Sequence, residues 1–330
     1  MDLSTTYLGM KLPNPLIAGA GPLVDDLDMV RRLEDAGIAA IVMHSLFEEQ
    51  IEGEARRTVN DMEMYAESYL EATSYFPRSH EFTLGPENYL EQIRRIKAAV
   101  DVPIIASLNG TTPCGWLKYS ALMQEAGADA LELNIYYLPS DPDENGAQVE
   151  QRVLDSLRLV KASVTIPVAV KLSPFYSSML NLAVSIDRLG AQGLVLFNRV
   201  YQSEIDAELL NVVAQLQLST SAELPLRLRW LGIIFGRINA PLSVSGGVHT
   251  GLDAVKAVMA GASGVQLVSA LLREGPEHVA VVLSEMTAWM DEHHYNSIRE
   301  MLGCLSLRSC PDPSGYERAN YARALQSWRG

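Results

Sequence analysis

The sequence predicts a single (β/α)₈ barrel, and three observations support the prediction. Eight short, almost wholly apolar segments recur along the 330-residue chain. Longer segments, with apolar residues spaced three to four apart, lie between them. Several of these longer segments end at a glycine, where helices often close with a left-handed residue. A doubly wound open sheet is the alternative architecture for the same alternation.

The apolar segments are the predicted strands of a parallel sheet. Strands that are buried on both faces are continuous apolar runs, whereas half-exposed strands alternate polar and apolar residues. Each segment here is a short run of the first kind. In chain order they cover residues 15–20, 39–44, 103–108, 130–135, 167–172, 193–197, 242–245 and 264–267.

The intervening segments are predicted helices with one apolar face. In the first of them, Leu27, Val30 and Leu33 recur at helical spacing. The predicted helices cover residues 26–36, 87–100, 116–126, 148–163, 177–189, 224–237, 252–260 and 277–292. Four of them are followed by glycines that we expect to cap them, which are Gly37, Gly127, Gly190 and Gly261.

We expect one domain spanning residues 1–330, because no linker interrupts the alternation. Two regions fall outside the repeat. Residues 48–84 form a long excursion after the second strand, and such excursions often cover a barrel's active site. The tail at residues 304–330 ends in a predicted amphipathic helix, which we expect to pack on the barrel or against a second copy. Its apolar residues are Tyr321, Leu325 and Trp328.

The composition predicts a cytoplasmic protein that acts on a small molecule. A net charge of −14 at pH 7 argues against a nucleic-acid or anionic-membrane partner. No apolar run reaches the roughly 20 residues of a membrane span, and the N-terminus lacks a signal-peptide pattern. Cys114, Cys304 and Cys310 form no CxxC pair, which fits a reducing compartment, and we expect no metal site.

Residues at the strand ends are the candidate site, because barrel chemistry lies at the carboxyl ends of the strands. The fourth, fifth and sixth strands end near Asn134, Lys171 and Asn198. A buried ammonium needs an anion or a polar partner, which favours a function for Lys171. The two amides suit a ring edged with carbonyl and N–H groups. Small residues after the first strand, Gly19 and Ala20, would let a flat ring approach the backbone.

The last two strands predict a phosphate site. Gly246 and Gly247 follow the seventh strand, and Val268 and Ser269 follow the eighth. Loops at these positions bind phosphate in many barrels, where exposed backbone N–H groups contact the anion. The pattern therefore predicts a phosphorylated ligand without identifying it.

The sequence resembles the dihydroorotate dehydrogenase family, and its cytosolic class especially, over residues 3–303. The segments that carry the resemblance are GMKLPNPLIAGAG, GADALELN, IPVAVKLSPF and PLSVSGGVHTGLDAVKAVMAGASGVQLVSALLREGP. The resemblance implies an FMN-dependent oxidoreductase of pyrimidine biosynthesis that works as a homodimer. It also implies hydride transfer between substrate C6 and flavin N5, while a base removes a proton from C5.

The resemblance also implies which residues contact FMN. Lys171 would lie near N1 and O2 of the flavin and stabilise the reduced, anionic ring. Asn109, at the end of the third strand, is a further candidate. The full set of implied contacts is Gly19, Ala20, Asn109, Asn134, Lys171, Asn198, Gly246, Gly247, Val268 and Ser269.

The sequence departs from the family where the catalytic base is expected. The family carries a Cys or Ser base in a pattern like N-x-S-C-P-N, whereas this chain reads NIYYLPS from Asn134. Tyr137 is therefore a candidate base, a candidate acid, or a ring that packs over the flavin together with Tyr136. A family T-K-S segment reads MHS here, and His44 is a candidate to balance flavin charge in its place. Cys114 is a lesser candidate base.

Three functions stay open at this stage. The first is a flavoenzyme that oxidises a dihydropyrimidine or reduces an activated C=C bond. The second is a non-redox barrel enzyme acting on a phosphorylated substrate, and the third is a flavin-binding protein without turnover. The chain has no dinucleotide fingerprint and no cysteine set for an iron–sulfur cluster. Family analogy alone points to fumarate or a quinone as the electron acceptor.

Overall fold

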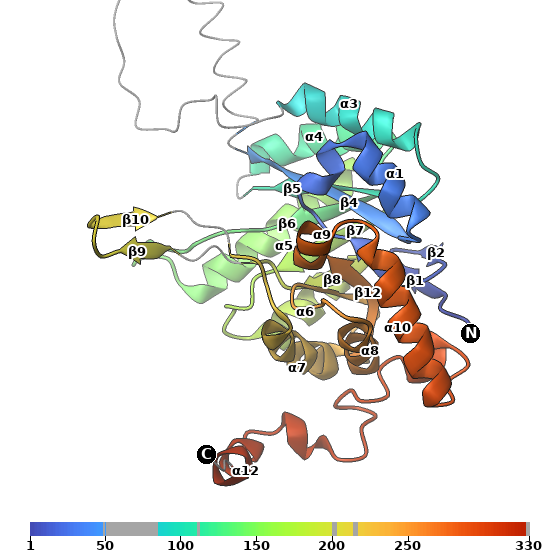
Figure 1. Ribbon diagram of the computed structural model, residues 1–330. Coiled ribbons are helices and arrows are strands. Elements are labelled where there is room, and N and C mark those ends of the chain that lie inside the picture. Colours follow the sequence, from blue (N-terminus) through green and yellow to red (C-terminus); the bar gives the residue numbers. More distant parts are fainter. Residues whose placement is uncertain (49, 51–84, 111–112, 200–202, 214–216, 328–330) are drawn as a thin grey trace, which may run out of the picture.

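Eight parallel strands close into a barrel, hydrogen-bonded in the order β11-β12-β3-β4-β5-β6-β7-β8 (Figure 1). This computed structural model describes the chain except residues 49, 51–84, 111–112, 200–202, 214–216 and 328–330. The barrel strands are β3 (Leu16–Ala18), β4 (Ala40–Phe47), β5 (Ile104–Asn109), β6 (Ala130–Asn134), β7 (Val168–Leu172), β8 (Gly193–Leu196), β11 (Leu242–Ser245) and β12 (Ala262–Leu267). Each overlaps a predicted strand, which confirms the (β/α)₈ barrel over the doubly wound sheet.

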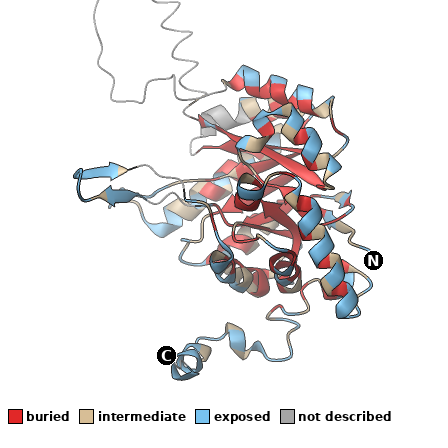
Figure 2. Ribbon diagram, in the orientation of Figure 1, coloured by how far each residue is buried: buried red, intermediate tan, exposed pale blue. Residues whose placement is uncertain are grey.

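Helices surround the barrel, with their apolar faces buried against the strands (Figure 2). They are α1 (Leu27–Asp35), α3 (Pro86–Lys97), α4 (Pro113–Glu125), α5 (Gly146–Ser163), α6 (Met179–Arg188), α7 (Leu224–Ile234), α8 (Gly251–Ala260) and α10 (His278–Glu292). The short helix α9 (Ser269–Glu274) precedes α10, and α11 (Ile298–Met301) follows it. The four predicted glycine caps all adopt positive φ, between 81° and 121°, as the sequence predicted.

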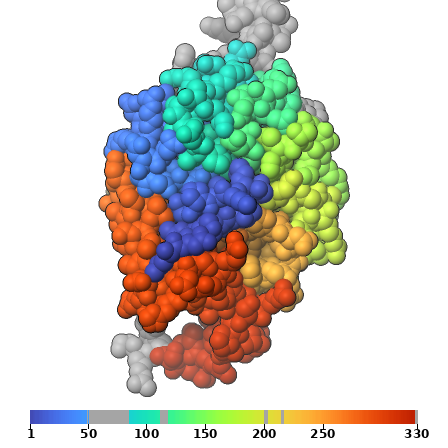
Figure 3. Space-filling model, turned by 90° about the vertical axis from the view of Figure 1, so that its right-hand side faces the viewer, coloured from blue at the N-terminus to red at the C-terminus, as the bar shows by residue number. Residues whose placement is uncertain are grey.

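An N-terminal hairpin closes the end of the barrel where the strands begin. It consists of β1 (Thr5–Tyr7) and β2 (Met10–Leu12). Figure 3 shows this dark-blue segment across the middle of that face, with the helices around it. Tyr7, Leu8 and Leu12 are almost fully buried and pack on apolar residues of the strands, including Ile17 and Val195. The hairpin therefore fills one end of the interior, and the carboxyl ends of the strands are left for a ligand.

Two segments extend from the barrel with their apolar side chains exposed. The hairpin of β9 (Glu204–Asp206) and β10 (Asn211–Val213) projects on the opposite side from the N-terminus (Figure 1). The tail contains η3 (Pro313–Tyr316) and α12 (Asn320–Ser327), on which Tyr321 is 70% exposed. The predicted tail helix is therefore present, but it does not pack on the barrel. Its contact with a second copy stays a prediction, and Trp328 lies outside the described residues.

Between the barrel and α3, a buried tyrosine compensates an irregular strand pair. The register of β4 against β5 shifts between Val42 and Ser45. Beside this shift, the buried Tyr89 hydroxyl donates a hydrogen bond to the Ser107 carbonyl at 3.1 Å. It also accepts one from the Ser107 N–H at 2.9 Å. The hydroxyl thus satisfies both backbone groups of a residue one layer behind the site.

We expect Tyr89→Phe to lower the free energy of unfolding by about 1–3 kcal/mol, because two buried backbone groups lose their partner. Urea unfolding measures the loss. The control is Tyr321→Phe, whose exposed hydroxyl should contribute less than about 0.5 kcal/mol. Equal losses in the two variants would contradict this role for Tyr89.

Candidate active site

A cavity of about 550 Å³ opens at the carboxyl ends of the barrel strands. This volume lies within the range of roughly 300–1,000 Å³ that is usual for small-molecule sites. Most of the predicted site residues line it, and these are Ala20, His44, Asn134, Lys171, Asn198, Gly246, Val268 and Ser269. The structure thus brings together residues that are distributed over most of the chain.

Three other predicted residues lie directly behind this wall. A Cβ at Gly19 would stand 2.6 Å from Val268, so the absence of a side chain there permits the close packing. Asn109 is buried and is the register partner of Asn134 on the neighbouring strand. Gly247 does not line the cavity, and its N–H donates a hydrogen bond to Ser219 Oγ. Their predicted flavin contacts stay predictions.

The ends of β6 and β8 present amide groups that have no partner among the described residues. Asn134 donates from Nδ2 to Ser45 Oγ at 3.2 Å, and this bond orients its Oδ1 away from Ser45. Asn134 Oδ1 and Asn198 Nδ2 are both buried and unpaired. An unpaired buried polar group costs about 1–3 kcal/mol. One free acceptor and one free donor on a cavity wall therefore favour a ligand that offers both kinds of group.

Lys171 lies at the base of the cavity in a buried polar network. Its Nζ donates to Glu132 Oε1 at 3.1 Å and to Gln266 Oε1 at 3.0 Å. The Gln266 amide also donates to the second oxygen of Glu132. The predicted need of Lys171 for an anion is thus met inside the protein. Glu132 was missed from the sequence, although its place two residues before Asn134 on a strand puts both on one face.

The residues of the predicted anion site lie at the ends of β11 and β12. Gly246 and Gly247 adopt φ of 84° and 82°, and a Cβ at Gly246 would stand 2.8 Å from the buried Arg227 guanidinium. Ser219 links the two strand ends: its N–H donates to Ser269 Oγ at 3.0 Å and its Oγ accepts from the Gly247 N–H at 3.3 Å. Ser219 was missed because it lies in an irregular loop. Backbone N–H groups and a buried cation here favour phosphate.

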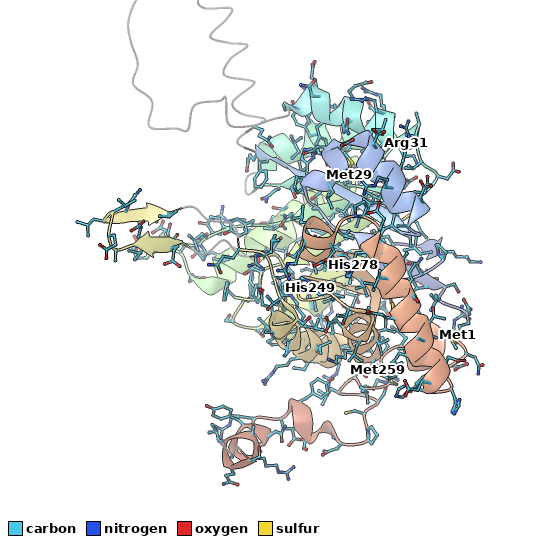
Figure 4. All side chains as sticks on the ribbon, viewed as in Figure 1. Met1, Met29, Arg31, His249, Met259 and His278 are labelled. Atoms are coloured by element: carbon cyan, nitrogen blue, oxygen red, sulfur yellow. The ribbon has the colours of Figure 1, made fainter. Side chains whose placement is uncertain are left out.

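Two histidines lie behind the predicted anion site. His249 Nε2 lies 3.3 Å from Ser219 Oγ, and His278 Nε2 lies 2.7 Å from the His249 carbonyl. Figure 4 shows both histidines beside α9. Burial is the main cause that lowers the pKa of His249, with Arg273 adding to the effect. The neutral form of this ring is therefore favoured, and it lies within hydrogen-bond distance of the Ser219 hydroxyl.

His44 and Asp25 form a pair on the cavity wall. His44 Nδ1 lies 2.6 Å from Asp25 Oδ1, at ion-pair distance although outside hydrogen-bond geometry. The imidazole meets the ring of Tyr89 edge-on at 5.0 Å. Burial lowers the pKa of His44, and Asp25 only partly opposes the shift. The lowered pKa favours the neutral ring, which suits a proton acceptor, and the predicted charge-balancing role of His44 stays a prediction.

Tyr137 does not line the cavity in this structure. Its hydroxyl donates to Glu144 Oε2 at 2.6 Å, and its ring lies under the Arg152 guanidinium at 4.5 Å. The bond to Glu144 is the main cause that raises the pKa of Tyr137. In this position the hydroxyl is engaged by Glu144 and does not face the cavity, and the predicted action of Tyr137 on a ligand stays a prediction.

The remaining sequence expectations concern cysteines, metals and membranes. Cys304 and Cys310 are free thiols, and the Cys114 side chain lies outside the described residues. Within the described part of the chain, no group of three or more His, Cys, Asp or Glu residues is placed to bind a metal. The same part contains no helix with the length and apolarity that crossing a bilayer requires.

The fold is a (β/α)₈ barrel whose cavity, at the carboxyl ends of the strands, has the place and the size of an enzyme site. The sequence model of dihydroorotate dehydrogenase matches residues 2–290. The chain belongs to this family, and it is an oxidoreductase that acts on CH–CH bonds. The non-redox alternative is therefore not supported.

Similar proteins span nearly the whole chain. The catalytic subunit of dihydroorotate dehydrogenase B (NAD(+)) from Thermoplasma acidophilum is 30% identical over 310 residues, which cover 92% of this chain and 98% of the relative. The corresponding subunit from Pyrococcus abyssi is 27% identical, over 91% and 98%. The NAD-dependent dihydropyrimidine dehydrogenase subunit PreA from Escherichia coli is 26% identical, over 92% and 76%.

The lowered pKa of His44 predicts a pH dependence of stability. Below its ordinary value of 6.5, the unfolded chain binds a proton at this ring more readily than the folded chain does. The free energy of unfolding therefore falls as pH falls through that region. We expect His44→Asn to make this fall shallower, measured by urea unfolding at about pH 7.5 and about pH 5.5.

His249, whose pKa is also lowered, should retain part of the effect in the His44→Asn variant. The control is His293→Asn, at an exposed position, which should leave the slope as in the parent protein. An unchanged slope in His44→Asn would show that His44 is not buried as described.

Proposed function

We propose that the protein is an FMN-dependent oxidoreductase that transfers a hydride between FMN and a dihydropyrimidine or another unsaturated carbonyl compound. The observation that supports this most is the pair of unpaired amide atoms, Asn134 Oδ1 and Asn198 Nδ2, in the cavity wall that Lys171 also lines. When bound, FMN supplies a two-electron carrier whose pyrimidine edge alternates carbonyl and N–H groups. Unpaired acceptors and donors at a cavity wall match such an edge.

Two groups of residues at the cavity would bind different parts of this cofactor. Asn134, Asn198 and Lys171 would hold the ring edge. The backbone N–H groups near Gly246 and Ser269, with the hydroxyl of Ser219, would hold the phosphate. The glycine at position 246 supports this, because any side chain there meets Arg227. The described cavity volume fits a ligand of this size class.

We further propose that His44 transfers the substrate proton, in place of the Cys or Ser base of the family. Three features support it: the ring lines the cavity, its pKa is lowered by burial, and Asp25 lies against Nδ1. A neutral imidazole beside a carboxylate accepts a proton and is stabilised by the carboxylate charge when it does so. Tyr137, whose hydroxyl is engaged by Glu144, is not needed for this step.

The names of the relatives support an assembly with a further subunit. They are called catalytic subunits or subunits, and NAD is part of their names. We propose that electrons leave this chain toward NAD⁺ on a partner subunit, since its own sequence contains no dinucleotide fingerprint. Exposed apolar side chains on the β9–β10 hairpin, Ile205 and Val212, offer a contact surface. A cytoplasmic location and a homodimer of this chain remain further proposals by family analogy.

The cofactor proposal is tested by loading the purified protein with FMN. We expect stoichiometric binding, and anaerobic bleaching of the flavin absorbance by dihydroorotate or another dihydropyrimidine. Lys171→Met should bind FMN more weakly and slow the bleaching, because the ring edge loses its cation. A protein that takes up no FMN under any of these conditions would overturn the proposal.

The proton-transfer proposal predicts opposite results for two variants. With whichever dihydropyrimidine bleaches the parent protein, His44→Asn should slow anaerobic flavin reduction by about 10²-fold or more, as loss of a general base does. Tyr137→Phe should leave the rate nearly unchanged. Stopped-flow absorbance measures both. A large loss in Tyr137→Phe combined with none in His44→Asn would return the role to the tyrosine.

A further inference from the structure

Glu132, the buried ion-pair partner of Lys171, takes no part in the proposed hydride or proton transfer. Glu132 lies on β6, Lys171 on β7 and Gln266 on β12, and the side chains of Glu132 and Lys171 are only 1% and 6% exposed. Since β6 and β12 are not neighbours in the barrel, the Glu132–Gln266 bond crosses its interior. The three side chains form a closed ring of hydrogen bonds beneath the cavity.

The charges in this ring cancel. Glu132 contributes one negative charge and Lys171 one positive charge at 3.1 Å. Below them, burial is the main cause that raises the pKa of Tyr7, and Glu132 raises it further, so that the phenol stays neutral. A buried carboxylate is costly to desolvate, and an apolar residue of similar volume is often no less stabilising than a buried ion pair. Stability alone therefore does not account for Glu132.

We propose that Glu132 is a positioning residue and counter-ion for Lys171, which fixes Nζ at the base of the cavity and offsets part of its charge. The inference rests on the proposed binding of FMN. A lone ammonium beside the ring edge would favour the reduced state of FMN, because that state carries more negative charge. The carboxylate behind the ammonium moderates this preference, and so sets the midpoint potential of the bound cofactor.

Glu132→Gln tests this most simply, since the amide is close in shape to the carboxylate and carries no charge. In the FMN-loaded full-length protein, we expect the two-electron midpoint potential to rise by at least about 30 mV, which is a tenfold change in the equilibrium. The control is Asp129→Asn, which loses a Lys97 ion pair just before the opposite end of β6. Its potential should match the parent's.

The exchange variant Glu132→Gln, Gln266→Glu keeps the question decidable if Glu132→Gln retains no flavin. It moves the carboxylate to the other side of the ring of hydrogen bonds, where the parent's Gln266 Oε1 lies 3.0 Å from Lys171 Nζ, so the potential should return toward the parent's. FMN bound to Glu132→Gln at the parent's potential, or to the exchange variant at a potential at least about 30 mV above the parent's, would overturn the inference and leave the proposed function intact. A parent protein that binds no FMN would overturn both.

A measurement without FMN tests whether Glu132 balances the charge of Lys171. Glu132→Gln should lower the melting temperature of the FMN-free protein, because a buried ammonium loses its counter-ion. The double variant Glu132→Gln, Lys171→Met should recover part of that loss. A merely structural Glu132 would lower the melting temperature but leave the potential of the loaded protein unchanged, and that result would contradict the proposal.

Discussion

A buried ammonium at the centre of the barrel is the constraint on which the rest of the site depends. Lys171 is almost inaccessible to water, and such a charge persists only if anions and acceptors surround it. Glu132 on β6 and Gln266 on β12 supply them. Asn134 is the register partner of Lys171, and Glu132 lies two residues earlier on the same strand. The neutralised pair leaves a polar floor for the cavity, and Asn134 and Asn198 line the cavity above it, each with one unpaired amide atom.

The barrel itself could be predicted from the sequence because its signal is local. Continuous apolar runs and helical spacing are properties of neighbouring residues, and the glycine caps at Gly37 and Gly261 follow from backbone sterics. The strand ends could be predicted for the same reason. The partners of those residues could not, because contacts such as that between Glu132 and Gln266 join residues 134 positions apart. No local pattern encodes that pairing.

The base illustrates a second limit of sequence reasoning. Because no Cys or Ser occupies the family's base position on the loop after β6, the sequence favoured the nearest phenol, Tyr137. The structure instead engages that hydroxyl with Glu144, and brings Asp25 from η1 (Pro22–Asp25) against His44 on β4. A short helix and a strand thus form an acid–imidazole pair at the cavity. The proposal that His44 transfers the proton is consistent with a chain that keeps the family's residues for the cofactor but differs from the family where the substrate would bind.

The most direct test of the central claim is an electron-density map of the protein soaked or crystallised with FMN. The ring should lie across the strand ends, with its pyrimidine edge within hydrogen-bond distance of Asn134, Asn198 and Lys171. The phosphate should meet the backbone near Gly246 and Ser269. A map in which FMN binds elsewhere, or in which those amides turn away from the ring, would contradict a site organised around the buried ammonium.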